Sequence, residues 1–462
     1  MSKDNNPLQK TQLKAFDLKK STMLIALVGV MIIFQALILS KGSGDFFSPS
    51  NISNLIGQNS YVLILATGML LCILTGGNID LSVGSGVCLV SAIAGVLIVD
   101  MHLNIYLSIA ICLLCGTAMG ALQAYFIAYM RIPPFIVTLA GMLTFRGIAY
   151  IILNGMTISP FPENYVKIFN GFLPGSGADK GTQMTVTMIV AAVLCAVIVV
   201  ISFYSRIRKQ KKGYPVTPLY AEVIKLVVIC AVLVWAFNLL GQNKGIPVVL
   251  ITLAVIILAY NYFTSKTVPG RHLYALGSNE KAAIFSGINT KRSMFFAYTN
   301  MGFLVAVAAL VCVARFNSAS PAAGTNYELD AIGACFIGGA SAYGGTGTVG
   351  GTVIGAVLMG VLNNGMSILG IDANWQRAVK GVVLLLAVII DVTSQKRRGG
   401  GGKGLFGGLF NKKKDEGVPA PAATGPDKGM DKADLRDFST DKLMKGTGSD
   451  EEEKQKKAKT EE

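Results

Sequence analysis

The sequence has little charge and few of the side chains that enzymes use for catalysis. Only 15% of its 462 residues are charged, and its two histidines, His102 and His272, lie far apart in segments of different polarity. They do not predict a metal site. No Ser/His/Asp arrangement or carboxylate pair indicates catalysis, and no G-x-x-x-x-G-K-[ST] phosphate loop is present. We therefore expect no catalytic residues and no directly bound cofactor; if ATP drives this protein, another subunit binds it.

Cysteine is also scarce, and its pattern favours packing over redox or metal chemistry. All eight cysteines fall within apolar segments. Cys112 and Cys115 have the spacing of a redox or zinc pair, but no second Cys/His pair accompanies them. Small apolar side chains in a membrane helix explain them better.

Apolar residues are what the sequence has in excess. Hydrophobic residues make up 52% of the chain, and the mean hydropathy is +0.54, values typical of a polytopic membrane protein. We expect an all-α fold of about 10–12 transmembrane helices, each needing roughly 20 residues. The run at 328–340 is short and flanked by glycine, so it is a candidate re-entrant segment. The apolar runs are 21–40, 57–75, 86–101, 105–130, 133–153, 184–205, 221–241, 246–263, 294–316, 328–340, 349–370 and 376–393.

The basic residues predict the orientation of the chain in the membrane. The net charge of +15 could suggest nucleic-acid binding, but most of this charge sits in short segments beside apolar runs. Twelve crossings with the N-terminus inside would place every basic connector in the cytoplasm, so we expect both termini there. These connectors are Lys10–Lys20, Arg131, Arg206–Lys212, Lys266–Arg292 and Lys396–Arg398.

Composition divides the chain into three regions. Residues 1–20 are polar, contain no signal-peptide pattern and form the expected cytoplasmic N-terminal segment. Residues 21–395 hold the transmembrane domain. Residues 396–462 begin with a glycine linker and show no apolar periodicity, which predicts a disordered cytoplasmic tail with no role in transport.

The longest clearly polar segment between apolar runs in the second half of the chain is Thr264–Arg292, which we name the central loop. We expect a turn at Pro269-Gly270 and then a short helix, capped by Ser278 or Asn279 and closed by Gly287. Two turns of helix are not stable alone, so packing must hold them. The segment is either a docking helix for a soluble partner or an ordinary connector lying on the membrane surface.

Four separated motifs resemble one transporter family. GRHLYALGSNEKAAIFSGI (Gly270–Ile288) is similar to the coupling loop of bacterial ABC importer permeases in the ribose/galactose/xylose branch. GGNIDLSVG (Gly76–Gly84), PPFIVTLAGMLTFRG (Pro133–Gly147) and the whole of Arg315–Gly370 resemble the same branch. The resemblance covers roughly residues 50–395. Residues 202–263 look like an extra pair of spans with a basic loop, as in the longer xylose-type and multiple-monosaccharide permeases.

The resemblance implies a permease subunit of an ATP-driven monosaccharide importer in the bacterial plasma membrane. It further implies a homodimer around one pathway, a cytoplasmic ATP-binding cassette subunit and an extracytoplasmic sugar-binding protein. Ala282 and Ala283 would be exposed where the ATPase approaches, and Glu280 would offer a charge. The residues expected to couple the chain to its ATPase are Gly270, Arg271, Ala275, Gly277, Glu280, Ala282, Ala283 and Gly287.

Two other functions compete with this interpretation. An ion-coupled secondary transporter would normally show intramembrane carboxylates and a long inverted repeat, but Asp80 is the main candidate carboxylate and no repeat is evident. A non-transporting membrane scaffold would not need the many polar groups inside the apolar runs.

Those polar groups are the candidate lining of a substrate pathway, because each is costly in a membrane unless paired or wetted. A sugar is neutral and rich in hydroxyls, so hydrogen-bonding side chains suit its route better than strong charges. Asp80 and Arg146 have an alternative structural role, paired with each other or with backbone, and Lys380 also lies within a run. The candidate pathway residues are Asn78, Asp80, Gln123, Arg146, Asn363 and Asn364. A dinucleotide fingerprint at Gly345–Gly350 lacks the preceding strand and the later acidic residue, so we expect these glycines to serve tight turns and close packing.

Overall fold

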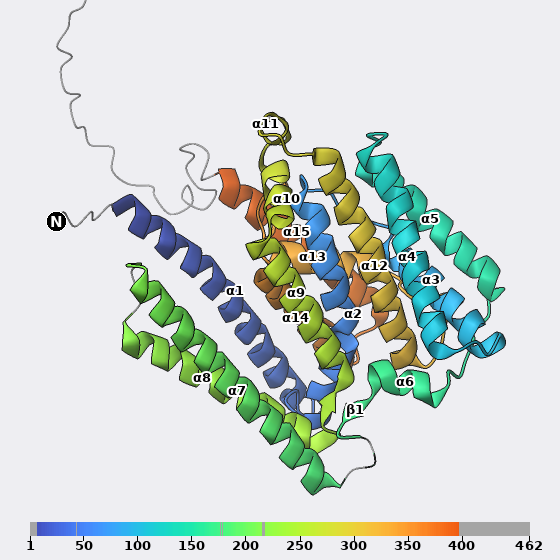
Figure 1. Cartoon of the computed structure of the whole chain (residues 1–462). Helices are drawn as coiled ribbons and strands as arrows, with labels where there is room; N and C mark the ends of the chain where they lie inside the picture. Colours follow the sequence, from blue (N-terminus) through green and yellow to red (C-terminus); the bar gives the residue numbers. More distant parts are fainter. Residues whose placement is uncertain (1–6, 43, 176, 178, 215–217, 397–462) are drawn as a thin grey trace, which may run out of the picture. The chain divides into compact units, whose positions relative to one another are not determined.

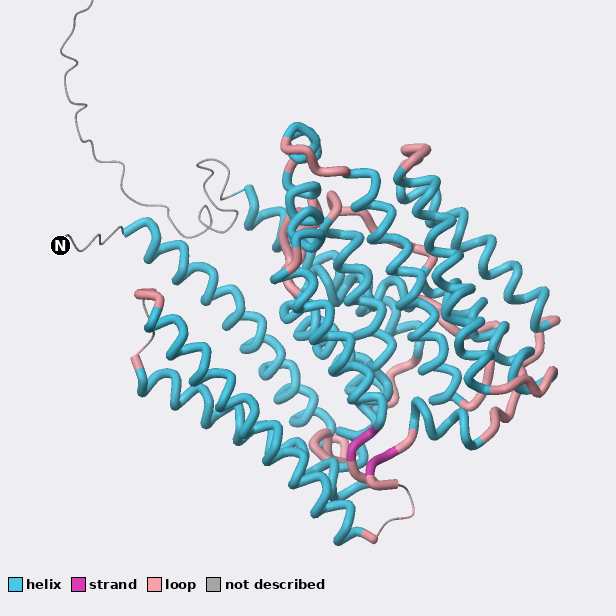
Figure 2. The backbone as a smooth tube through the Cα atoms, viewed as in Figure 1, coloured by secondary structure: helices cyan, strands magenta, loops and turns pink. Residues whose placement is uncertain are grey.

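The computed structural model describes residues 7–42, 44–175, 177, 179–214 and 218–396. Almost all regular structure in these ranges is helical (Figure 2), which confirms the all-α prediction. Ten of the described helices are long and apolar enough to cross a membrane, in agreement with the expected 10–12. The predicted disordered tail lies outside the described residues from 397 onward.

The helices follow one another with short connections. Helix α1 already begins at Pro7, inside the polar segment, because proline is well tolerated in a first turn and the following Leu, Gln, Lys and Ala residues favour helix. The helices are α1 (Pro7–Ser40), α2 (Pro49–Leu74), α3 (Val83–Gly95) with a π-helical turn at Val96–Asp100, α4 (Ile105–Ala128), α5 (Pro134–Leu153), α6 (Glu163–Asn170), α7 (Lys180–Lys211), α8 (Leu219–Asn243), α9 (Val248–Lys266), α10 (Val268–Ser278), α11 (Glu280–Phe285), α12 (Thr290–Phe316), α13 (Tyr327–Ile337), α14 (Val349–Ile368) and α15 (Ala373–Lys396).

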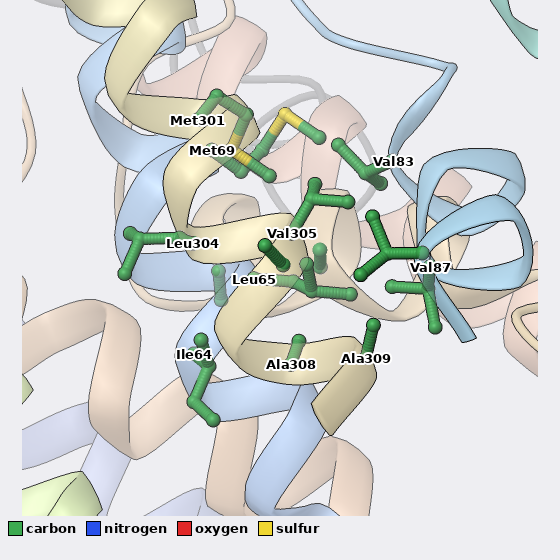
Figure 3. Close-up of a cluster of buried hydrophobic side chains, with 14 of the residues drawn as sticks. Ile64, Leu65, Met69, Val83, Val87, Met301, Leu304, Val305, Ala308 and Ala309 are labelled. Carbon is green, nitrogen blue, oxygen red and sulfur yellow. The ribbon is translucent and has the colours of Figure 1, made fainter. Parts of the chain in front are cut away.

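The core is built around α2 and α12, which are surrounded by other helices and therefore bury most of their surface. Figure 3 shows Leu65 and Met69 of α2 against Met301 and Val305 of α12, with Val87 of α3 closing the cluster. Small residues bring α4 against α12: a Cβ on Gly120 would lie 2.6 Å from the carbonyl oxygen of Tyr298. Such close backbone approach is the usual way in which membrane helices associate.

Two interruptions of irregular backbone lie between consecutive helices of the bundle. The first interruption, residues 75–82, separates α2 from α3, and the second, residues 317–326, separates α12 from α13. We name them break 1 and break 2. Helix α13 has 11 residues and rises about 16 Å, too little to cross a bilayer alone. A third irregular segment, residues 338–348, joins α13 to α14; we name it the α13–α14 loop.

Helices α7 and α8, drawn in green in Figure 1, form a hairpin, and α8 packs against α2. Its base is tied to the bundle by a short antiparallel pairing of β1 (Phe172–Leu173) with β2 (Ile246–Pro247). Within residues 202–263, α9 packs against α2. The helix pair that projects from the bundle is thus α7–α8.

Candidate functional site

The central loop folds as two consecutive helices, α10 and α11. Thr267 caps α10, its hydroxyl accepting a hydrogen bond from the Gly270 N–H at 3.1 Å. Asn279 ends α10 and caps α11, its side chain accepting from the Ala282 N–H at 3.0 Å. Gly287 follows with a left-handed φ of +80°. The predicted short helix, its asparagine cap and its closing glycine are therefore confirmed.

The predicted turn at Pro269-Gly270 is wrong. Both residues lie in the first turn of α10, where proline fits because its missing N–H would have no partner in the helix. Gly270 is buried there, and a Cβ on it would overlap the carbonyl oxygen of Phe263. This glycine permits close packing of α10 on the end of α9.

The predicted exposure of Ala283 is also wrong. Ala283 is only 4% exposed, whereas Phe285 is 90% exposed and Ile284 is 45% exposed. Ala283 accepts a hydrogen bond from the Ile288 N–H at 3.0 Å, so the chain folds back over this side of α11. The exposed apolar surface of α11 is therefore formed by Ile284 and Phe285, beside the exposed Ala282.

Helix α10 rests directly on the end of α2 and on the α13–α14 loop. A Cβ on Gly277 would overlap the carbonyl oxygen of Leu74, at the end of α2, and would lie 2.5 Å from the Gly345 nitrogen. The Tyr274 hydroxyl donates to the carbonyl oxygen of Gly347 at 3.0 Å, and burial raises the pKa of this phenol. Gly277 therefore faces the bundle, whereas Arg271 and Glu280 are exposed.

The α13–α14 loop in turn packs against break 1. A Cβ on Gly77 would overlap the carbonyl oxygen of Ala342, and one on Gly344 would lie 2.5 Å from the Cα of Gly76. Both Gly344 and Gly345 have positive φ. Gly345 and Gly347 therefore serve turns and close packing, as the sequence suggests, whereas a Cβ on Gly350 would meet no atom within 4 Å.

A cavity of about 260 Å³ opens next to α11. It is bordered by the connection between α4 and α5, which includes Arg131 and Pro133, and by Glu280, Thr290 and Lys291 from the other side. The cavity joins the two polar connectors at this end of the bundle into one concave surface.

Within break 1, the Asp80 carboxylate accepts hydrogen bonds from Ser82 rather than pairing with a cation among the described residues. Its carboxylate accepts from the Ser82 N–H at 2.9 Å and from the Ser82 hydroxyl at 2.6 Å. Ser82 is also 3.1 Å from the side-chain oxygen of Gln123 on α4. Asp80, Ser82 and Gln123 are all buried and line a cavity of about 10 Å³, which has room for about one water molecule.

Arg146 holds break 2, and no ion pair with Asp80 forms among the described residues. Its guanidinium donates to the carbonyl oxygens of Pro321 and Ala323 at 3.0 and 2.6 Å. The sequence left open whether Arg146 pairs with Asp80 or with backbone, and the structure shows that it pairs with backbone. Gly84 and Gly324 join the breaks, since a Cβ on either would overlap the carbonyl oxygen of the other.

Of the remaining pathway candidates, Asn363 and Asn364 lie apart from this cluster. Asn364 exchanges hydrogen bonds with Asn51 at 3.0 and 2.9 Å, which locks α14 to the start of α2. Asn363 is buried beside it on α14. Asn78 donates to Thr75 within break 1 itself. The structure therefore brings Asp80 and Gln123 together, with Asn78 in the same break, places Arg146 at the second break, and leaves Asn363 and Asn364 elsewhere.

A buried ion pair is the main feature that the sequence did not reveal. The Lys380 ammonium lies 2.9 Å from one carboxylate oxygen of Asp330, and the Tyr61 hydroxyl donates to the other oxygen at 2.9 Å. Asp330 is 1% exposed. Lys380 stood out as a charge within an apolar run, but nothing in the sequence assigned its partner on α13. The pair fastens α15 to α13 and α2.

We predict that Asp80→Asn is tolerated, because the amide oxygen can still accept both hydrogen bonds from Ser82. Asp80→Leu would leave the buried Ser82 N–H without its acceptor, at a cost of about 1–3 kcal/mol, and should lower the amount of folded protein. Fluorescence-detected size-exclusion chromatography and sugar uptake measure both effects. Normal accumulation of both variants without uptake would contradict a structural role and favour a direct one in the pathway.

Comparison with known proteins gives a consistent family. Residues 51–388 match the family model described as branched-chain amino acid transport system / permease component. The xylose transport system permease protein XylH of Escherichia coli K12 is 36% identical over 81% of this chain and 92% of its own length. XylH of Haemophilus influenzae is 38% identical over 82% of this chain and 97% of its length. The ribose import permease protein RbsC of Escherichia coli K12 is 34% identical over 81% and 94%. No solved structure matches significantly.

Proposed function

The chain belongs to the family of branched-chain amino acid transport system permease components, and we propose that it is the membrane-spanning permease subunit of an ATP-driven monosaccharide importer. It is a multi-pass protein of the bacterial plasma membrane and not itself an enzyme. Relatives that are 34–38% identical carry xylose or ribose in their names, which supports a sugar rather than a branched-chain amino acid as substrate.

One observation carries the proposal: the central loop is in direct contact with the end of α2 and with the α13–α14 loop. Gly277 and Tyr274 of α10 touch the end of α2 and the α13–α14 loop, and that loop touches break 1. A soluble partner that pulls or pushes on α11 would therefore displace irregular backbone rather than the middle of a continuous helix. In transporters, irregular backbone of this kind lies beside the binding site around which the helices move.

The partners that we propose follow from the lack of a phosphate-binding loop in the sequence and from the small volume of the polar cavity. The sequence contains no phosphate-binding loop, so ATP would be bound by a separate cassette subunit that docks on α11. An extracytoplasmic binding protein would select and deliver the sugar. The polar cluster beside Gln123 encloses only about 10 Å³, much less than a monosaccharide occupies. A pathway between two copies of the chain is therefore the arrangement that we propose.

The placement of charge supports an orientation with both termini in the cytoplasm. Figure 1 shows the start of α1, the α4–α5 and α7–α8 connections and the end of α15 toward the same end of the bundle as α10 and α11. This end carries Arg131, Arg206–Lys212 and Lys266–Arg292. Basic residues gather on the cytoplasmic side of membrane proteins.

Reconstitution tests the proposal against an ion-coupled transporter. The purified chain, its cassette subunit and its binding protein in sealed vesicles should take up radiolabelled xylose or ribose only when ATP reaches the cytoplasmic side. Uptake should survive ionophores that collapse ion gradients. Uptake that is abolished by ionophores and needs no cassette subunit would refute the proposal, and so would failure of the cassette subunit to co-purify with the chain.

A further inference from the structure

The tip of the α7–α8 hairpin carries a cationic pocket that the transport function does not use. The cavity has a volume of about 210 Å³ and is lined by Ser205, Arg208, Lys209, Lys212 and Tyr214. Every one of these side chains can donate a hydrogen bond, three are cationic, and no carboxylate lines the cavity. We infer that this pocket binds the phosphate of an anionic phospholipid headgroup.

The expected position of the pocket relative to the bilayer favours a lipid headgroup as its ligand. Helix α7 has 32 residues and is about 48 Å long, more than the roughly 30 Å of a hydrocarbon core. Its apolar stretch continues to Phe203, and its first charge afterwards is Arg206. Tyr204, Tyr214 and Tyr220 are 62–70% exposed around the tip, and exposed tyrosines are typical of the membrane–water interface. The pocket therefore begins where the hydrocarbon ends.

The pocket's cations have no competing partner in the described part of the chain. Arg206 is paired with Glu222 of α8, which fixes the two helices to each other at the tip. Arg208, Lys209 and Lys212 form no ion pair among the described residues. Near the end of α7, Lys212 donates its backbone N–H to the carbonyl oxygens of Arg208 and Lys209, and Tyr214 also donates to Lys209. The partial negative charge at this end of the helix is offset by the three cationic side chains of the pocket.

The hairpin also needs an anchor at this end. The buried residues of α7 are Gln183, Thr187 and Ala191, all in its first turns. Beyond them α7 contacts mainly α8, and its other faces are covered with apolar side chains such as Val200 and Ile201. A bound anionic lipid would hold the distal half of the hairpin at the cytoplasmic surface, where each nearby Lys or Arg adds to the attraction for acidic lipids.

The test compares lipid binding by the full chain and by two matched triple variants. Purified protein is incubated in detergent with radiolabelled phosphatidylglycerol or phosphatidylcholine, and retained lipid is measured after gel filtration. We expect the wild-type protein to prefer phosphatidylglycerol. The variant Arg208→Gln/Lys209→Gln/Lys212→Gln should bind this lipid with an affinity at least roughly tenfold lower. The control Lys41→Gln/Lys180→Gln/Lys244→Gln removes the same charge from the opposite end of the helices and should bind as wild type does.

Added inorganic phosphate distinguishes the two ligands that could supply a phosphate group, a phospholipid headgroup and free phosphate. Phosphate should not displace phosphatidylglycerol, because a lipid also inserts its chains beside α7. Displacement by free phosphate would show an anion site that takes soluble phosphate and would overturn the lipid assignment. Equal binding of the two lipids by wild-type protein, or an equal loss in both triple variants, would overturn it as well. Because α7 is exposed at its tip, the triple variant should keep the wild-type elution profile.

Discussion

Replacing Phe285 with glutamate is expected to abolish ATP-driven sugar uptake while leaving the amount of folded protein in the membrane unchanged. Phe285 is 90% exposed on α11 and lies beside the 45% exposed Ile284. A large aromatic side chain on a short, well-capped helix is the kind of residue that dominates a protein interface, where its loss costs at least about 2 kcal/mol. A glutamate in its place would add the cost of burying an unpaired carboxylate, so the affinity for the cassette subunit should fall by about 30-fold or more.

Two variants serve as controls for this effect. Phe285→Leu keeps an apolar side chain and should retain most of the binding and uptake. Ala283→Arg places a long cation at a position that is 4% exposed, so it should disturb the packing of α11 and reduce folded protein rather than affect docking alone. The measurements are uptake in vesicles, co-purification of the cassette subunit, and protein amount in the membrane.

The alternative for the central loop makes a different prediction. If α11 only lies on the membrane surface, Phe285 is buried among lipid headgroups and Phe285→Glu weakens that contact without affecting the cassette subunit. Normal co-purification and normal uptake in Phe285→Glu would therefore remove α11 from the coupling interface. Normal co-purification with lost uptake would instead place Phe285 in the transmission of movement after docking.

Local features of the fold were predictable where one residue type decides the outcome. The apolar runs predict the membrane helices because a bilayer demands about 20 apolar residues. Asn279 and Gly287 predict the ends of α11 because a side-chain cap and a left-handed residue have few substitutes. The Pro269-Gly270 turn was predicted wrongly because the same two residues also suit the first turn of a helix, and only the packing of α10 on α9 decides between them.

Contacts between distant segments could not be predicted in the same way. Ala282 and Ala283 are adjacent and identical in chemistry, yet one is exposed and the other is buried, since the direction of α11 depends on how the chain returns to α12. Asn364 finds its partner in Asn51, 313 positions away, and no local pattern marks that pairing. Of the pathway candidates, Asp80 and Gln123 meet only because break 1 turns back toward α4.

Removing the positive member of the buried ion pair is expected to have the second large effect. Lys380→Gln would leave the Asp330 carboxylate with the Tyr61 hydroxyl as its remaining partner. Breaking a buried pair by deleting one charge typically costs about 3–5 kcal/mol, because the other charge stays buried without compensation. This is a large share of the roughly 5–15 kcal/mol that stabilises a folded domain. The amount of monodisperse protein and its melting temperature should both fall.

The double variant Asp330→Asn/Lys380→Gln should recover much of that loss. It removes both charges, allows an amide–amide hydrogen bond between α13 and α15, and keeps an oxygen that can accept from Tyr61. Helix α15 packs on the rest of the bundle mainly through α13, and its Asp391 accepts from the Ala342 N–H of the α13–α14 loop at 3.1 Å. The ion pair thus fixes one end of a helix whose other end touches the segment on which α10 rests.

Sugar uptake by these two variants shows whether the ion pair only stabilises the fold or also takes part in transport. If the ion pair serves only to hold α15 in place, the double variant should recover both folded protein and uptake. Recovered protein with lost uptake would mean that the charges themselves, and not merely the attachment of α15, take part in transport. If Lys380→Gln alone accumulates and melts as the wild type does, α15 is held by its apolar packing, and the ion pair has no structural role.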